Sequence, residues 1–410
     1  DYQEARWAKA AAAARDVVEM GKRGVYRLYT VKARSEGTPD YPATITPPKH
    51  SVYSYENYPE GWADIDPLQS YQNLFNGNLY PSDNPEMVFT TGQNFNAYWL
   101  AMRGMPMEIG GWNCYAMTGK QCDAYEMNTG RPFDKEKDYR GDNNYVNAQE
   151  EASGTYAPLR QGVSKRYAHR EPRFYASCAY NGTFWAASSA ELPENRNKQV
   201  FYYRGTESGW GISSSVLRTG IGVMKYISQR DNAKGGSVIA KPSVGIRYAD
   251  VLLWYAEALN ELQPGAQHSI TSWDGSQSYT ITRDEPEMHY AIKRVRLRAG
   301  LPDYDDDVYQ SQEEFRKKLK HERQIEFFAE NCRYFDLRRW KDAQEEESMP
   351  ITGCNIYMSE TARDYFHTQV TLSDIPTTFN RKMYFWPISK NELNKNFRMT
   401  QNPGWESYDQ

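Results

Sequence analysis

The residues best placed for chemistry are two glutamates one helical turn apart, Glu322 and Glu326. Carboxylates at this spacing project from one face of a helix and could act together in general acid–base catalysis. The surrounding stretch is rich in arginine, and nearby guanidinium groups lower carboxyl pKa values and keep the carboxylates ionised. The pattern therefore favours structural ion pairs over a catalytic pair.

The helix that carries Glu322 and Glu326 should be buried along the face on which these two charges lie. Phe315 and Leu319 start an apolar stripe that would continue at 322, 323 and 326, where Glu322, Arg323 and Glu326 stand instead. Buried charges persist only when they are paired and hydrogen-bonded. We predict a packed helix pair in which these side chains form ion pairs across a turn near Asn331. The expected basic partners are Arg333, Arg338 and Arg339.

Recognised catalytic and metal-binding motifs are missing from the sequence. The six histidines form no HExxH pair, the five cysteines form no CxxC pair, and no G-x-S-x-G occurs. An acidic loop at Asp303, Asp305, Asp306 and Asp307 offers oxygen ligands for Ca²⁺ but lacks the glycine and distal glutamate of an EF-hand. We expect no cofactor. Calcium held by Asp303, Asp305 and Asp307 is the alternative to a solvated acidic turn.

Aromatic residues are the outlier of the composition, at 14% with 32 Tyr and 11 Trp. Tyrosine and tryptophan rings can stack on the C–H faces of sugars, while amide and guanidinium groups bind hydroxyls. The segment between residues 94 and 115 mixes these groups without helical or strand periodicity, and suits an oligosaccharide or equally a peptide. Its candidate ligand contacts are Asn96, Tyr98, Trp99, Arg103, Trp112, Asn113 and Tyr115.

Two further aromatic clusters are weaker candidates, because loop packing explains each ring as well as ligand contact does. The first holds Tyr53, Tyr55, Tyr58 and Trp62, of which we select Tyr55 and Trp62 as ligand contacts. The second holds Trp185, Tyr202, Tyr203 and Trp210. A different class of function, glycan cleavage by two loop carboxylates such as Glu108 and Asp123, also stays open, although no motif sets their separation.

Bulk properties narrow the choice of partners and architecture. A net charge of -4 over 410 residues gives no basic stripe for nucleic acid, and no apolar run reaches the roughly 20 residues that span a bilayer. Helical periodicity and capping residues predict helices over 4–20, 66–77, 247–262 and 288–299, with another starting at Ser311. Asn181-Gly182 predicts a hairpin over 172–184.

The helical blocks resemble the SusD/RagB family of outer-membrane nutrient-binding lipoproteins of Bacteroidota. The resemblance rests on the blocks Arg247–Glu261, Val295–Leu301 and Glu322–Trp340, and on Pro387-Ile388 with Gln401-Asn-Pro-Gly404. It implies a mainly α fold, a tetratricopeptide-like helical repeat scaffold with a large irregular insert of loops and short strands. We expect a scaffold helix at 1–24, the aromatic ligand-binding region at 25–245 and the C-terminal helical region at 246–410.

The resemblance also implies a function without catalysis. Such a protein binds a nutrient at the cell surface, usually a glycan and sometimes a peptide, and delivers it to a SusC-like TonB-dependent outer-membrane transporter. We expect location at the bacterial outer membrane, with a lipid anchor carried by a segment upstream of Asp1. The irregular insert would supply the ligand surface, and the block around Glu322 and Glu326 would belong to the scaffold.

Overall fold

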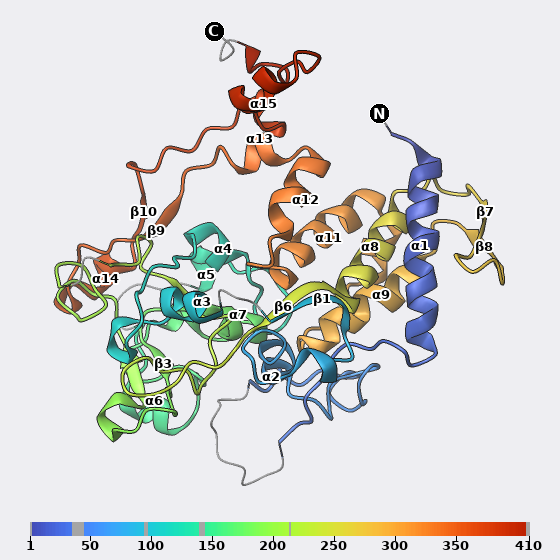
Figure 1. Cartoon of the computed structure of the whole chain (residues 1–410). Coiled ribbons are helices and arrows are strands. Elements are labelled where there is room, and N and C mark those ends of the chain that lie inside the picture. Colours follow the sequence, from blue (N-terminus) through green and yellow to red (C-terminus); the bar gives the residue numbers. More distant parts are fainter. Residues whose placement is uncertain (1, 35–44, 94–96, 139–143, 213–214, 407–410) are drawn as a thin grey trace.

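The computed structural model describes residues 2–34, 45–93, 97–138, 144–212 and 215–406 (Figure 1). The α-helices are α1 (Glu4–Lys22), α2 (Pro67–Gln72), α3 (Ala97–Gly104), α4 (Gly119–Ala124), α5 (Lys135–Asp138), α6 (Ala148–Ala152), α7 (Pro172–Ser177), α8 (Tyr248–Asn260), α9 (Glu285–Arg298), α10 (Asp306–Gln310), α11 (Gln312–Glu326), α12 (Cys332–Trp340), α13 (Ala343–Glu346), α14 (Arg363–Phe366) and α15 (Lys390–Lys395). Short 3₁₀ helices are η1 (Pro81–Asp83), η2 (Met107–Ile109), η3 (Lys165–Tyr167), η4 (Pro193–Asn195), η5 (Glu360–Ala362) and η6 (Arg381–Tyr384). The strands are β1 (Met87–Gln93), β2 (Cys178–Ala179), β3 (Thr183–Trp185), β4 (Lys198–Val200), β5 (Gly222–Val223), β6 (Pro242–Arg247), β7 (His268–Thr271), β8 (Ser278–Ile281), β9 (Thr352–Cys354) and β10 (Gln369–Thr371). They pair as two-stranded antiparallel sheets, β1–β6, β2–β5, β3–β4, β7–β8 and β9–β10.

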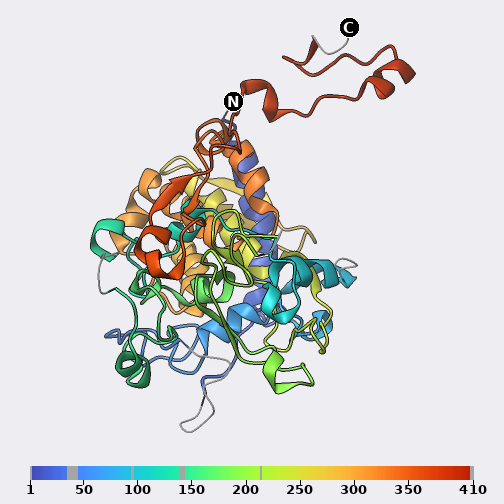
Figure 2. The same ribbon diagram turned by 90° about the vertical axis from the view of Figure 1, so that its left-hand side faces the viewer.

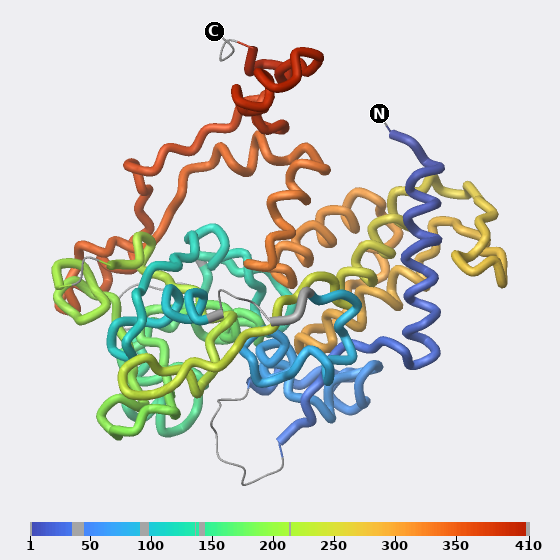
Figure 3. The backbone as a smooth tube through the Cα atoms, viewed as in Figure 1, coloured from blue at the N-terminus to red at the C-terminus, as the bar shows by residue number. Residues whose placement is uncertain are grey.

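The long helices form one packed layer, with α8 in contact with both α1 and α9 (Figures 1 and 3). Small residues allow the close approach, since Ala8 and Ala11 of α1 and Ala249 and Ala256 of α8 are fully buried. A Cβ atom on Gly21 would lie 2.1 Å from the Tyr248 hydroxyl oxygen. The mainly helical scaffold predicted from the sequence is confirmed.

Helix starts follow the capping residues. The Asp66 carboxylate accepts a hydrogen bond from Gln69 N at 3.0 Å, and Ser311 Oγ accepts one from Glu314 N at 3.2 Å. Each bond satisfies a backbone N–H group that the first turn of a helix leaves without a partner. Local chemistry therefore sets where α2 and α11 begin.

The hairpin predicted over 172–184 is wrong. Pro172 begins α7 in place of a strand, and the two short strands on either side of Asn181 pair elsewhere, β2 with β5 and β3 with β4. The Asn181 side chain is buried and accepts a hydrogen bond from Tyr202 N at 2.6 Å. Pairing with distant segments overrides the local turn preference.

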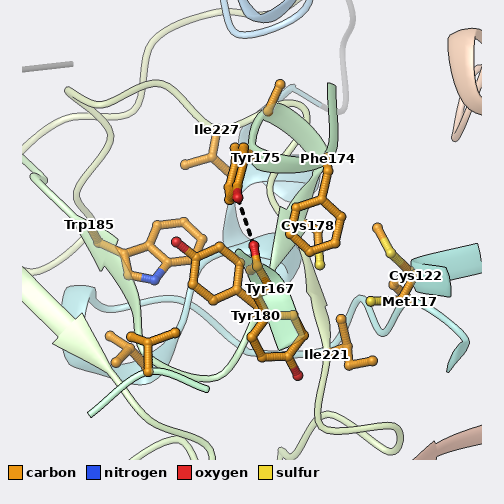
Figure 4. Packing of buried hydrophobic residues seen from close by; sticks show 14 of the residues in the cluster. Met117, Cys122, Tyr167, Phe174, Tyr175, Cys178, Tyr180, Trp185, Ile221 and Ile227 are labelled. Atoms are coloured by element: carbon orange, nitrogen blue, oxygen red, sulfur yellow. Dashed lines mark hydrogen bonds between the residues drawn. The ribbon is translucent and has the colours of Figure 1, made fainter. Parts of the chain in front are cut away.

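The irregular region between α1 and α8 has its own core, built largely of aromatic side chains (Figure 4). Tyr167 stacks on Tyr180 with ring centroids 5.0 Å apart, and Tyr175 donates a hydrogen bond to the Tyr167 carbonyl oxygen at 2.7 Å. Much of the unusual aromatic content is thus used in packing.

The C-terminal segment beyond β10 runs away from the body of the molecule (Figures 1 and 2). Phe379 packs with Leu337 and Ala343 at its base, whereas Trp386 and Phe397 farther along are exposed. Within the residues described by the structure, none of the helices has the length and apolar character needed to cross a bilayer.

Candidate ligand-binding site

Three exposed aromatic rings come together on α3 and the loop that follows it. Trp99 lies 5.0 Å from Trp112, ring centroid to ring centroid, with the ring planes at 45°. Tyr98 meets Trp99 edge to face at 5.4 Å. The three residues are 49% (Tyr98), 43% (Trp99) and 38% (Trp112) exposed, although large apolar rings are normally withdrawn from water. We call this group the first aromatic platform.

Backbone hydrogen bonds return the loop to α3 and so bring Trp112 to Trp99. Trp112 N donates to Met102 O at 2.5 Å, and Cys114 N donates to Arg103 O at 2.8 Å. Gly111 permits the return, because a Cβ atom there would lie 2.1 Å from Met105 O. The platform is therefore set by the backbone before any ligand arrives, which lowers the entropy that binding must overcome.

Asn113 does not contact ligand as predicted, because its side chain is only 1% exposed. Its backbone is left-handed, with φ of 50°, and its Nδ2 atom donates to Ser208 O at 2.8 Å. Ser208 Oγ in turn accepts a bond from Met107 N at 3.0 Å and donates one to Glu108. Asn113 thus ties the platform loop to the segment around Ser208, a structural role that polar character alone does not distinguish from binding.

The remaining candidates of this segment are placed in different ways. Arg103 is exposed on α3, one turn beyond Trp99 and on the same face, where a guanidinium group could reach a bound hydroxyl. Tyr115 is half-buried behind the loop. Asn96 lies outside the described residues.

The aromatic cluster at residues 53–62 separates into core and surface. Trp62 is only 6% exposed and packs with Ile65 and Leu297, so its assignment as a ligand contact is wrong. Tyr53 contacts Trp62 at 5.6 Å and covers the same small core. Tyr55 is exposed, and its role in ligand contact stays a prediction.

The aromatic cluster at residues 185–210 also divides into core and surface residues. Trp185, Tyr202 and Tyr203 belong to the aromatic core, where Figure 4 shows Trp185. Trp210 is exposed and meets Tyr357 edge to face at 5.0 Å. Sequence reasoning missed Tyr357, because it lies 147 residues along the chain from Trp210 and follows no local pattern.

The two loop carboxylates proposed for glycan cleavage are engaged within the fold. Burial raises the pKa of Glu108, while the hydrogen bond from Ser208 acts to lower it. Asp123 lies between two cations, 3.0 Å from Lys135 Nζ and 3.5 Å from Arg166 Nη2. Both side chains therefore have contacts within the fold.

The acidic loop proposed for calcium has other partners. Asp303 binds His289 Nδ1 at 2.8 Å and accepts hydrogen bonds from Tyr304 N and the Tyr309 hydroxyl. Asp305 stands at the N-cap position of the short helix α10, without a side-chain capping hydrogen bond. Across the described ranges, no three His, Cys, Asp or Glu side chains come together as a metal-binding group.

Glu322 and Glu326 lie in a buried network of charges, as their spacing on the apolar stripe indicates. Arg173 Nη1 approaches Glu322 at 2.6 Å and Glu326 at 2.9 Å, and none of these three side chains is exposed. The network contains six carboxylates and five cations: Glu86, Glu126, Glu171, Glu322, Glu326 and Glu330, with Arg173, Lys225, Arg247, Arg296 and Arg298.

The electrostatics of the network hold its central carboxylates ionised. Burial by itself would raise the pKa of Glu322, but the charges of Arg173 and Arg296 outweigh it and lower the pKa to about 2. Arg298, Arg247 and Arg173 outweigh burial at Glu326 in the same way and hold its pKa well below the usual range. A general acid needs a proton near neutral pH, so these glutamates are structural.

The predicted partners of Glu322 and Glu326 are wrong. Arg333 binds Glu346 at 3.0 Å, Arg338 binds Glu347 at 2.8 Å, and Arg339 binds Glu257 at 2.7 Å. Arg323, also buried, pairs with Asp336 at 2.8 Å. The turn near Asn331 is present with φ of 64°. However, the arginines of α12 bind Glu346 and Glu347 just after this helix and Glu257 on α8, and the network draws its cations from other segments.

Several solved structures have a fold similar to that of this chain. The chain aligns over 98% of its length with the selenomethionine form of BT4246, at 19% identity and a TM-score of 0.70, covering 65% of that chain. A SusD-like protein from Bacteroides fragilis, BF3747, aligns with 82% of this chain at 24% identity and a TM-score of 0.58. The alignment covers 57% of the BF3747 chain. A SusD-like carbohydrate binding protein from the same species, BF0978, aligns with 79% of this chain at 23% identity and a TM-score of 0.53. The alignment covers 56% of the BF0978 chain.

The chain therefore spans about three fifths of the length of these solved structures. No curated protein matches it. The model of the SusD family matches residues 81–405, which include the irregular region from η1 onward, the network and the C-terminal segment. This chain is a member of the SusD family.

Proposed function

We propose that this protein binds an oligosaccharide at the cell surface and delivers it to a SusC-like TonB-dependent transporter of the outer membrane. The observation that carries the proposal is the first aromatic platform, in which the exposed rings of Trp99 and Trp112 lie 5.0 Å apart on a backbone already in place. Flat apolar faces beside a guanidinium group match the alternating C–H and hydroxyl surface of a sugar chain.

Membership of the SusD family supports the role, and one solved structure of similar fold is described as a carbohydrate binding protein. Lipid anchorage at the outer membrane and the transporter partner follow from the same family role and are part of the proposal. Binding without turnover is expected, because the carboxylates at Glu322 and Glu326 are locked in ion pairs.

Isothermal titration against a panel of oligosaccharides and peptides tests the cargo. We expect Trp99→Ala and Trp112→Ala each to weaken binding about tenfold or more, because each removes one stacking face. Trp273→Ala is the matched control, since this residue is 74% exposed at the turn between β7 and β8. This hairpin lies on the opposite side of the molecule from α3 in Figure 1.

Each outcome of the titration separates the alternatives. Unchanged affinity in both platform variants would remove this surface as the site. Binding of peptides in place of sugars, with the same sensitivity to Trp99→Ala, would keep the transporter role with a different cargo. Release of shortened products, abolished by Glu108→Gln, would establish a glycan-cleaving enzyme instead.

The partner is tested separately, by co-expression with candidate SusC-like TonB-dependent transporters from the same genome and purification through a tag on either subunit. Recovery of both subunits in equal amounts from detergent supports the proposal. Recovery of the tagged subunit alone, from membranes that contain both, would contradict it.

A further inference from the structure

Two buried cysteines from separate elements contact each other in the aromatic core of the irregular region. Cys122 in α4 is 1% exposed, Cys178 at the start of β2 is fully buried, and Figure 4 shows both among the core side chains. Both are free thiols in the structure. They stand 56 positions apart in the sequence, so only the fold brings them together.

Backbone pairing on the two edges of one short strand, β5, positions these cysteines. Cys178 of β2 is the register partner of Val223 on one edge. Ala116 forms an antiparallel bridge with Gly222 on the other edge, and α4, which carries Cys122, begins three residues after Ala116. Backbone hydrogen bonds therefore fix both cysteines relative to the same strand.

The two thiol groups interact directly. A hydrogen bond from Cys178 lowers the pKa of Cys122, whereas burial, together with this bond, raises the pKa of Cys178. Sulfur atoms in such contact need only small side-chain rotations to reach the S–S bonding distance of about 2.05 Å. The pair thus has the arrangement from which a disulfide forms.

A third buried cysteine, Cys354 in β9, is the competing partner. It lies near Cys122, but its thiol interacts with Tyr167, and its backbone N–H group donates to Thr219 O at 2.8 Å. Thiols can also bind zinc, but a structural zinc site takes four ligands. Within the described part of the chain, no three His, Cys, Asp or Glu side chains come together as a metal site. The direct contact between thiols therefore singles out Cys122 and Cys178.

We propose that Cys122 and Cys178 form a disulfide when the protein folds in an oxidising environment. The inference goes beyond the proposed function and takes from it only the location at the cell surface, since disulfides form and persist outside the cytoplasm. The bond ties α4, which follows the loop of the first platform, to β2 in the core. It closes a loop of 56 positions and reduces the freedom of that loop in the unfolded chain. The cross-link therefore stabilises the support of the first platform without contact to ligand.

The bond forms by thiol–disulfide exchange with an external disulfide, the usual oxidant of compartments outside the cytoplasm. The Cys122 thiolate attacks one sulfur of this disulfide, releases one thiol and is left in a mixed disulfide. The Cys178 thiolate then attacks the Cys122 sulfur and releases the second thiol. The two cysteines lose two electrons and two protons, which the two released thiols take up. Both steps precede closure of the core, because the folded protein buries both sulfur atoms.

Peptide mapping of the unmodified sequence tests the proposal. The chain is exported to the periplasm of a bacterial host, purified, alkylated with iodoacetamide in guanidinium chloride and digested with trypsin without reduction. Trypsin leaves each of the five cysteines in a separate peptide, with Cys122 in 121–135 and Cys178 in 174–196. We expect these two peptides to be linked and the other three cysteines to be alkylated. The same chain made in a reducing cytoplasm should have all five alkylated.

Alkylation of all five cysteines in the exported, folded chain would overturn the proposal. A link from 121–135 to 342–363, the peptide that holds Cys354, would overturn it as well. Neither result depends on a substitution, so the test does not require any variant to fold.

Thermal melting with and without a phosphine reductant measures what the bond contributes. The reductant should lower the melting temperature of the exported wild type by about 5 °C, and that of Cys354→Ala by as much, but should not change that of Cys178→Ala. Equal sensitivity of Cys178→Ala to the reductant would contradict the assignment. Oligosaccharide titration of the same samples keeps the two proposals apart. A linked chain that binds no ligand would remove the proposed function and leave the disulfide standing.

Discussion

Replacing Arg173 with methionine is the sharpest test of the buried network. Arg173 Nε lies 2.7 Å from Glu171, and its Nη1 atom lies 2.6 Å from Glu322 and 2.9 Å from Glu326. Methionine keeps most of the apolar stem but leaves three buried carboxylates without this cation. We expect the free energy of unfolding to fall by about 3–5 kcal/mol, the usual effect of breaking a buried ion pair.

The structure explains why the loss should not be larger. Three charge-assisted hydrogen bonds at about 1.5–3 kcal/mol each would sum to more. However, Glu322 keeps Arg296 at 2.8 Å, and Glu326 keeps Arg247 at 2.7 Å. Arg316→Met is the matched control on α11, because Arg316 pairs with Glu261 at the surface and should change stability by no more than about 1 kcal/mol.

The free energy of unfolding of the wild type and of Arg173→Met should depend differently on pH. The pKa of Glu322 is lowered from 4.5 to about 2 in the folded protein, so its ion pairs stabilise the fold above pH 4.5 and lose effect as pH falls towards 2. In Arg173→Met, burial is less opposed and the pKa of Glu322 should rise. The variant then loses less stability than the wild type on acidification. The difference in free energy of unfolding between the two proteins should therefore narrow below pH 4.5.

Urea denaturation followed by tryptophan fluorescence, at pH 7 and at pH 3, measures both effects. A loss of under about 1 kcal/mol at pH 7 would refute the assignment of Arg173 as the central cation of a buried network, since even an exposed pair reaches that value. A gap that is the same at pH 7 and pH 3 would refute the electrostatic origin of the loss and leave only packing.

Two further predictions concern His367 and Gly111. Burial, with Arg166 and Arg363 nearby, lowers the pKa of His367 from 6.5 to about 3, so stability is lost as pH falls from 6.5 towards 3. At pH 5 this loss amounts to about 2 kcal/mol, and we expect His367→Phe to escape it; equal losses between pH 7.5 and pH 5 in urea titrations of both proteins would contradict this. Gly111→Ala would place a Cβ atom 2.1 Å from Met105 O, so it should displace Trp112 and reduce oligosaccharide affinity about as much as Trp112→Ala does. Calorimetry checks this, with Gly265→Ala as the control for backbone strain outside the platform loop, because a Cβ atom there has no neighbour within 4 Å but its φ of 82° strains any side chain. Affinity equal to the wild type's in Gly111→Ala would show that the loop does not position the ring.

The parts of this fold that sequence could predict are those set by neighbouring residues. Asp66 and Ser311 cap their helices with hydrogen bonds that span three residues, so the start of each helix is visible in the sequence. Charges on an apolar stripe likewise indicated that Glu322 and Glu326 would be buried and paired. Their partners could not be predicted, because Arg173 is 149 positions from Glu322 and only the folded chain brings them together.

The candidate site shows the same limit. Sequence brought Trp99 and Trp112 into one candidate surface, and both are exposed and in contact. It could not distinguish them from Trp62, because a tryptophan among tyrosines serves a small core as well as a ligand surface. Nor could it distinguish a binding asparagine from Asn113, whose amide reaches a carbonyl 95 residues away.

The buried network and the first aromatic platform are connected along the chain through β1. Glu86 binds Arg247 at 2.8 Å and Arg298 at 2.9 Å, and the next residue begins β1, the strand that precedes α3 and Trp99. Ion pairs constrain direction as well as distance, because a guanidinium group binds carboxylates in its own plane. The backbone pairing of β1 with β6 contains several register shifts. The charges at its base therefore fix the starting point of the chain that carries the first platform, and rings held in this way can stack on a sugar without first being ordered.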